Sequence, residues 1–475
     1  MTGLHAATPA WKAFFTDIIA PLKPGADGRI TSAPAWAYLL ATISWIVTML
    51  RQLPCRYVDA SSNPDRFGWM CYSDITSLYF SRGQATGALP YASAQWEYPV
   101  LTGYFAGLAN GLGRLFGANT TEGISGQQMV DNMNIYFAIN AVGLFICLLW
   151  MIRSLLKLAP NSPGLAMLAA IAPAVWTTGL INWDLLPVAL VMAGLVAWKN
   201  DKTAQAGILW GLGVAAKLYP IVIIGALVVV CLRRDNRHSL AELKKWAIMA
   251  GSAAATWLLV NIPVMVAQWD GWATFYTYNS GRGADLGSLW YSLSLAGFDT
   301  GHPIVWSRLL MIVAYLGLAI LIFAAPAAPS PEQIAFLAVV IMIVGNLVYS
   351  PQYVLWLLPL LVLVRPKILD LSVFSVAELI YFVAIWLFLH GNDLTMGLGA
   401  APWFYIIAIW IRLAATIWIS VRVIRDVMSV PRSATPTGAR PARWGAWAEP
   451  KVGSHAAAAA PDEVLVRQPV VVREQ

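Results

Sequence analysis

Charged residues are scarce in this chain of 475 residues: they make up 12% of it, while 59% of the residues are hydrophobic. In soluble domains about a quarter of the residues are charged, so this composition excludes an ordinary soluble protein. The apolar residues fall in runs of about 18–25, the length that a helix needs to cross roughly 30 Å of hydrocarbon. The sequence therefore predicts an all-α polytopic membrane protein with about 11–13 transmembrane helices.

Cysteine and histidine are also rare, with four and five residues. None of them has the spacing of a zinc site, so we expect no metal and no cofactor. Cys147 and Cys231 lie in apolar runs, which is typical of packing residues. Cys55 and Cys71 flank a polar segment that we expect outside the cell. Oxidising conditions there favour a disulfide between them.

Basic residues exceed acidic ones, and the formal net charge is +7. They gather at the ends of apolar runs rather than on one face, which argues against a nucleic-acid partner. Because short Lys/Arg-rich loops mark the cytoplasmic side, four loops are expected inside: 153–163, 199–205, 233–245 and 365–369. Loops 54–96, 270–302 and 391–401 then lie outside. We expect a multi-pass protein of the plasma membrane.

The chain divides into three parts. Residues 1–33 are expected to be a cytoplasmic leader without a cleaved signal peptide, and 34–424 form the membrane domain with 54–96 as its first external loop. Residues 425–475, rich in Pro, Ala and Arg without periodicity, are expected to be a disordered cytoplasmic tail. Two segments fit the topology poorly. Segment 206–232 must be a broken hairpin, and 97–117 is either re-entrant or an exception to the rule.

The stretch "GWMCYSDITSLYFSRG", Gly68 to Gly83, holds a single acid, Asp74, among aromatic and hydroxyl side chains. Ionisable groups near the membrane interior are costly and are therefore functional candidates. Two interpretations stay open. Asp74 is a catalytic carboxylate with Tyr72 beside it at a substrate site, or Ser73 or Asp74 caps a short helix.

Lys217 lies near the middle of the long apolar run that contains "GVAAKLYPIVII". Pro220 cannot donate a hydrogen bond to the carbonyl of Ala216, so the helix must break or kink there. Lys217 then stands at the break as a ligand for a phosphate, with Tyr219 as a candidate substrate contact. Alternatively, the lysine side chain extends along the helix to an interface.

Arg282 lies in the glycine-rich outer loop "NSGRGADLGSLWY". Its guanidinium fork matches the oxygens of a phosphate, and the glycines allow the backbone to approach a ligand closely. Exposed loops of many functions share this pattern, so the motif by itself is weak.

Further polar residues gather at the outer ends of the apolar runs. The candidates for substrate binding among them are Glu97, Tyr98, Asn182, Asp184, Gln352, Tyr353 and His390. Each also has a structural interpretation: a helix start, an Asx turn, an aromatic interface anchor or a helix cap. Taken together, they place acids, cations and aromatics on one side of the membrane. This arrangement is typical of a site where a lipid phosphate and a polar acceptor meet.

An acid in the first outer loop, "EYPVL" at the start of the next helix, an Asp after a proline-containing helix, "AAKLYP" and "SPQYVLWLLP" follow one order. This order resembles that of the polyprenol-phosphate-dependent glycosyltransferases of the GT-C superfamily, specifically glycosyltransferase family 87. The resemblance covers about residues 34–424. It implies a helical bundle around an outward-facing cavity, with Asp74 as general base and Lys217, and less firmly Arg282, on the phosphate of the donor. The family more often has a second proline where this chain has Val100.

The resemblance further implies transfer of a sugar from a polyprenyl phosphate to an envelope glycolipid or polysaccharide on the outer face. Mannose is favoured over arabinofuranose on family frequency alone. A transporter or lipid flippase is the alternative of another class, because it would also have broken helices and buried charges. The sequence shows no internal repeat, which favours the enzyme.

Overall fold

The computed structural model describes residues 33–429 of the chain apart from short gaps. These gaps are residues 57–58, 60–63, 119–122, 124, 234–238 and 394–401. The expected leader and tail fall outside the described residues, except that Ala33 belongs to helix α2 and residues 425–429 continue helix α18.

The described residues form helices and no strands, which confirms the all-α prediction. Within the described ranges, five helices are long and apolar enough to cross a membrane: α5 (Gly126–Leu158), α11 (Ser239–Ala267), α14 (Pro303–Ala324), α17 (Ile368–Asp393) and α18 (Trp403–Ser429). Helix α2 (Ala33–Gln52) precedes them in the chain and ends in the short 3-10 turn η1 (Leu53–Cys55).

Other apolar runs become shorter helices that end at prolines and polar turns. They are α6 (Gly164–Ile171), α7 (Pro173–Thr178), α8 (Leu185–Lys199), α9 (Thr203–Ala216), α10 (Pro220–Cys231), α15 (Pro331–Gly345), η3 (Pro351–Tyr353) and α16 (Val354–Val364). Five of these apolar segments, with η3 joined to α16, have only 10–17 residues. The expected number of about 11–13 membrane helices counted apolar runs, and several of those runs are interrupted.

The predicted break at Pro220 is one of these interruptions. Lys217 is extended, with φ −160° and ψ 142°, and Pro220 is the first residue of α10. Segment 206–232 is therefore two helices, as the expected topology required. Proline suits the first helical position because its missing N–H has no partner there in any case.

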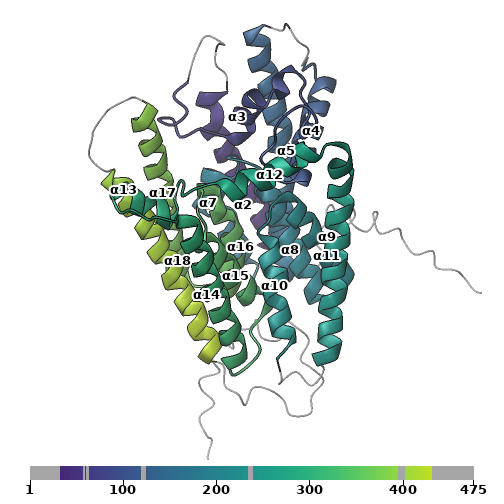
Figure 1. Ribbon diagram of the computed structural model, residues 1–475, viewed down its shortest axis with the longest axis vertical. Coiled ribbons are helices and arrows are strands. Elements are labelled where there is room, and N and C mark those ends of the chain that lie inside the picture. The colour runs from purple at the N-terminus through teal and green to yellow at the C-terminus, as the bar shows by residue number, and fades with distance from the viewer. Residues whose placement is uncertain are drawn as a thin grey trace, which may run out of the picture.

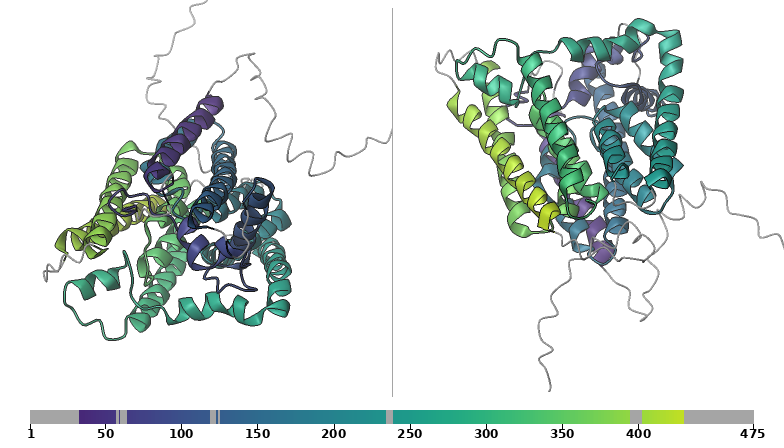
Figure 2. Two further views of the ribbon diagram at one scale, coloured as in Figure 1. Left: turned by 90° about the horizontal axis from the view of Figure 1, so that it is seen from above. Right: turned by 60° about the horizontal axis from the view of Figure 1, so that its bottom comes forward.

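The remaining helices gather at one end of the molecule (Figure 1). They are α3 (Asp74–Ser81), η2 (Gln84–Thr86), α4 (Val100–Leu115), α12 (Trp269–Gly281) and α13 (Leu289–Leu295). The C-terminal end of α18 and the N-terminal end of α11 lie at the opposite end (Figures 1 and 2). Parts of the loops expected outside, 54–96 and 270–302, therefore share one end of the bundle, which we call the outer end.

Close backbone contact between α9 and α11 depends on two glycines. A Cβ atom at Gly207 would lie 2.1 Å from the carbonyl oxygen of Met249, and one at Gly211 would lie 2.4 Å from that of Ala253. Small residues at this spacing let membrane helices approach closely. The packing holds the C-terminal end of α9, and with it Lys217, in place.

Candidate active site

Several of the polar residues that the sequence singled out meet where the short helices break. Three turns contribute: residues 179–184 between α7 and α8, residues 217–219 between α9 and α10, and the η3 turn that leads into α16. The N-terminal end of α3 and the segment before α4 complete the site from the outer end. Each break frees side chains and backbone groups that an intact membrane helix would keep occupied.

Asp74 is the first residue of α3, and the segment that carries it is bonded to the α7–α8 turn. The Asp74 backbone N–H donates to the carbonyl of Ile181 at 2.7 Å, and the Ser73 hydroxyl donates to that of Leu180 at 2.6 Å. Ser73 occupies the N-cap position without a side-chain cap hydrogen bond. Asp74 is thus the first helical residue rather than the N-cap residue.

Two tyrosines hold the Asp74 carboxylate. The Tyr72 hydroxyl donates to Oδ1 at 2.8 Å and the Tyr98 hydroxyl donates to Oδ2 at 2.7 Å. Burial raises the pKa of Asp74 above its ordinary value, while the hydrogen bonds from Tyr98 and Tyr72 and the charge of Lys217 oppose that rise. A carboxylate with a raised pKa is a stronger proton acceptor than an exposed one.

Lys217 forms an ion pair with Asp184. The Nζ–Oδ1 distance is 2.9 Å, and the side chains are 16% and 2% exposed. Asn182 shapes this turn, because its Oδ1 accepts from the Asp184 N–H at 3.0 Å and its Nδ2 donates to the Tyr98 hydroxyl at 3.4 Å. An ammonium group has three donors, so the ion pair leaves Lys217 two more for a ligand. Lys217 is thus held in the site rather than extended to an interface.

Aromatic rings enclose the ammonium group of Lys217. Its Nζ lies 4.7 Å from the ring centroid of Tyr98, 5.8 Å from that of Tyr353 and 6.0 Å from that of Trp356. Trp356 in turn stacks on Tyr353 at 3.9 Å and on Tyr219 at 4.4 Å. Cations are attracted to ring faces within about 6 Å. These rings therefore stabilise a charged lysine without using its hydrogen-bond donors.

Arg282 follows the last residue of α12 and pairs with Asp285, with Nε 2.9 Å from Oδ2. The loop that carries both residues is bonded to the segment before η3. The Asp285 N–H donates to the carbonyl of Leu347 at 2.8 Å, and the Tyr349 N–H donates to that of Leu286 at 3.1 Å.

Three further predicted candidates have other contacts. Glu97 forms a two-point ion pair with Arg82 at 2.7 and 2.9 Å. His390 contacts Asp65, with Nδ1 3.0 Å from a carboxylate oxygen, and so meets the first outer loop rather than Asp74 or Lys217. Gln352 is buried in η3, and its Oε1 has no hydrogen-bond partner among the described residues.

Cys55 and Cys71 form a disulfide across 16 positions of sequence, with their Cα atoms 5.9 Å apart. The Arg51 guanidinium also donates to the carbonyl of Met70. Both contacts tie the segment just before Tyr72 to the end of α2 and η1. Among the described residues, no three His, Cys, Asp or Glu side chains are grouped closely enough to hold a metal ion.

Several residues that contact the candidates, or that are charged inside an apolar run, were not singled out from the sequence. Trp356 lies in "SPQYVLW", where the sequence suggests only an aromatic anchor at the membrane interface. Arg82 lies in a polar loop, where a charged residue is common. Glu378 and Arg412 did carry a signal, because each is a lone charge inside an apolar run. The rule that such charges are functional candidates would have selected both.

The family model of glycosyltransferase family 87 matches residues 129–351. The match spans Asn182, Asp184, Lys217 and Arg282, and it ends at Pro351 in η3, while Asp74 and Tyr98 precede it. None of the curated proteins matches the chain. The chain is thus similar to glycosyltransferase family 87 over a little under half of its length, and this match together with the all-helical fold and its apolar helices supports a membrane glycosyltransferase.

Proposed function

We propose that the protein moves a sugar, with mannose favoured, from a polyprenyl-phosphate donor to an envelope glycolipid or polysaccharide on the outer face of the plasma membrane. Asp74 acts as general base, and Lys217 and Arg282 bind the phosphate of the donor. Arabinofuranose is the alternative sugar within the same family.

The observation that supports this proposal most strongly is that one tyrosine, Tyr98, contacts both Asp74 and Lys217. The Tyr98 hydroxyl donates to Asp74, and the Tyr98 ring lies 4.7 Å from the ammonium group of Lys217. One tyrosine side chain thus contacts both a carboxylate and a cation. A glycosyl phosphate needs this pair, because a proton leaves the acceptor on one side of the anomeric carbon and negative charge grows on the phosphate on the other.

The reaction follows from these positions as a single displacement. The acceptor hydroxyl oxygen bonds to the anomeric carbon while Asp74 takes its proton. The bond from that carbon to the phosphate oxygen breaks, and its electron pair stays on the departing polyprenyl phosphate. Lys217 and Arg282 stabilise the growing charge. Asp184 is engaged by Lys217 and only 2% exposed, so it orients the lysine rather than acting as a second base.

An apolar groove of about 520 Å³ between α13 and α18 suits the polyprenyl chain. Leu293, Phe298, Ile407 and Trp410 are among its lining residues. Helix α13 follows the loop of Arg282 directly, and the Gly287 N–H in that loop donates to a hydroxyl group of α18, that of Tyr405, at 2.9 Å. The groove and the proposed phosphate ligand therefore share one structural unit.

The experiment uses the full chain in proteoliposomes with a labelled polyprenyl-phosphate sugar and a glycolipid acceptor. We expect transfer of the label to the acceptor, faster with mannose than with arabinofuranose, and loss of transfer in Asp74→Asn. Movement of intact donor across the bilayer without transfer would replace the proposal by a flippase. Transfer of arabinofuranose alone would keep the enzyme and change the sugar.

A further inference from the structure

Arg412 of α18 and Glu378 of α17 form a buried ion pair that the proposed chemistry does not use. The Nε–Oε2 distance is 2.8 Å, and the side chains are 0% and 6% exposed. Moving each charge out of water costs several kcal/mol, and replacing such a pair by apolar residues is often neutral or stabilising. Stability alone therefore gives a poor account of this pair within an apolar bundle.

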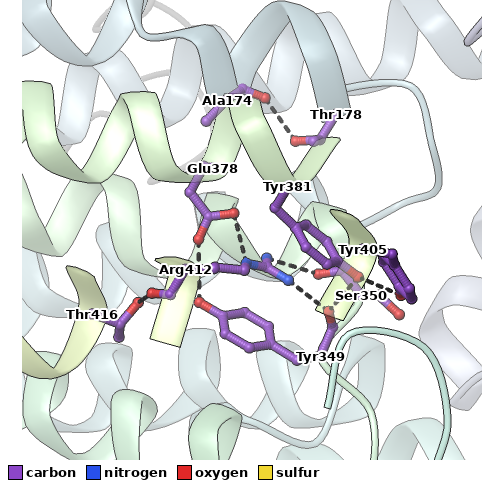
Figure 3. A network of polar contacts seen from close by, with 9 residues as sticks. All are labelled: Ala174, Thr178, Tyr349, Ser350, Glu378, Tyr381, Tyr405, Arg412 and Thr416. Atoms are coloured by element: carbon purple, nitrogen blue, oxygen red, sulfur yellow. Dashed lines mark hydrogen bonds and ion pairs between the residues drawn. The ribbon is translucent and has the colours of Figure 1, made fainter. Parts of the chain in front are cut away.

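The other donors of Arg412 reach the turn before η3, as Figure 3 shows. Nη1 donates to the carbonyl of Tyr349 at 2.6 Å, and Nη2 donates to that of Ser350 at 3.1 Å. The guanidinium carbon lies 3.4 Å from the ring centroid of Tyr349 and 4.1 Å from that of Tyr381. Carbonyl groups outside a helix need donors at this depth. Arg412 supplies them in one rigid fork.

The Glu378 carboxylate closes this network, because its Oε1 accepts from the Tyr349 hydroxyl at 3.2 Å. From there the contacts extend to the loop of Arg282. The Tyr381 and Tyr405 hydroxyls are 3.4 Å apart, and Tyr405 accepts from the Gly287 N–H at 2.9 Å. Gly287 has φ +75°, and a Cβ there would lie 2.2 Å from both the Tyr349 carbonyl and the Tyr381 hydroxyl. Loop and turn are thus packed as one body.

We propose that Arg412, held by Glu378, is a positioning residue that fixes the η3 turn and the Gly287 loop, and through them Tyr353 and Arg282, around the phosphate of the donor. This inference rests on the proposed function, in which Arg282 and Lys217 bind the phosphate, and the Tyr353 ring centroid lies 5.8 Å from the Nζ of Lys217. Arg412 touches neither the sugar nor the phosphate. Its effect arises because a misplacement of about 1 Å can cost a catalytic site roughly 10²-fold.

The test is Arg412→Lys in the full chain, with Arg365→Lys as the matched control. Arg365 is also buried, at 3% exposed, and pairs with Asp370 at 2.6 Å, but it follows α16 at the end opposite the outer end. Lysine keeps the charge but cannot reach Glu378 and two carbonyls at once. We expect hydrogen exchange of residues 282–288 and 346–350 to rise at least tenfold in Arg412→Lys and to stay unchanged in the control.

In the transfer assay, Arg412→Lys should raise the donor KM at least tenfold with a smaller change in kcat, while its melting midpoint stays near that of the control. If the single variant does not fold, Arg412→Met/Glu378→Leu removes both charges and leaves none unpaired; the same exchange increase is expected there. Unchanged exchange in the two segments would overturn the positioning role. A parent protein that transfers no sugar would overturn the proposed function instead, and the exchange data would still decide the inference.

Discussion

Replacing Asp74 by asparagine should separate chemistry from stability. Asparagine keeps one oxygen that accepts from Tyr98 or Tyr72, but it cannot take a proton from the acceptor. Loss of a positioned base typically costs 10²–10⁴-fold in rate, which is about 3–5 kcal/mol at 1.36 kcal/mol for each tenfold. We expect kcat to fall by that factor at saturating donor.

Although kcat falls, the stability of the Asp74→Asn variant should rise slightly or stay unchanged. Burial raises the pKa of Asp74 above its ordinary value of 3.8, so the folded state disfavours the charged carboxylate. A raised folded pKa contributes stability that is fully present below the unfolded pKa and is lost as pH rises through the folded value. The neutral asparagine removes this loss. At neutral pH the variant should melt at or above the parent temperature.

Tyr98→Phe is the matched control, because it removes one hydrogen bond from the carboxylate and keeps both the base and the ring beside Lys217. Of the influences that oppose the raised pKa of Asp74, the bond from Tyr98 is the largest. Its loss should raise that pKa further. The acid limb of kcat should therefore move to higher pH in Tyr98→Phe and disappear in the residual activity of Asp74→Asn.

The assay is single-turnover sugar transfer at saturating donor across a pH series, with thermal melts on the same preparations. An Asp74→Asn protein that melts normally and transfers within a few-fold of the parent rate would refute the base assignment. An acid limb that is unmoved in Tyr98→Phe would show that another group controls it.

Three further changes test the surrounding parts. Lys217→Met alone leaves the buried Asp184 carboxylate without its partner, which costs about 3–5 kcal/mol of stability. We therefore expect Lys217→Met/Asp184→Asn to fold better than the single variant and to raise the donor KM at least tenfold. A parent-like KM would exclude the phosphate role. Cys55→Ser/Cys71→Ser should lose about 3 kcal/mol of unfolding free energy, the value for a closed loop of about this length, and an unchanged melting midpoint would contradict this. Ala414→Trp should fill the groove beside α18 and raise the KM of a long-chain donor but not of a short-chain one, and equal effects on both donors would place the chain elsewhere.

Many residues of the candidate site could be predicted from the sequence, because single residues such as prolines and lone charges carry strong local signals. Pro220 must interrupt a helix whatever surrounds it, so the break beside Lys217 was predictable from sequence. Asp74 stood out as one acid between apolar runs. The partners of these residues could not be predicted in the same way. Lys217 pairs with Asp184, and Asp74 accepts a hydrogen bond from Tyr98. In each pair the two residues lie at the ends of different helices, and the periodicity of the sequence does not predict which helix ends lie close together.

The sequence by itself determined the all-α membrane fold, the helix break at Lys217 and the residue types available for chemistry, because burial in lipid and proline geometry act locally. The tertiary structure alone decided which charges are engaged. Glu97 binds Arg82, His390 contacts Asp65, and Arg412 reaches the η3 turn from α18. Ion pairs depend on distances of a few ångströms between side chains far apart in sequence, and only the packing of the helices sets those distances.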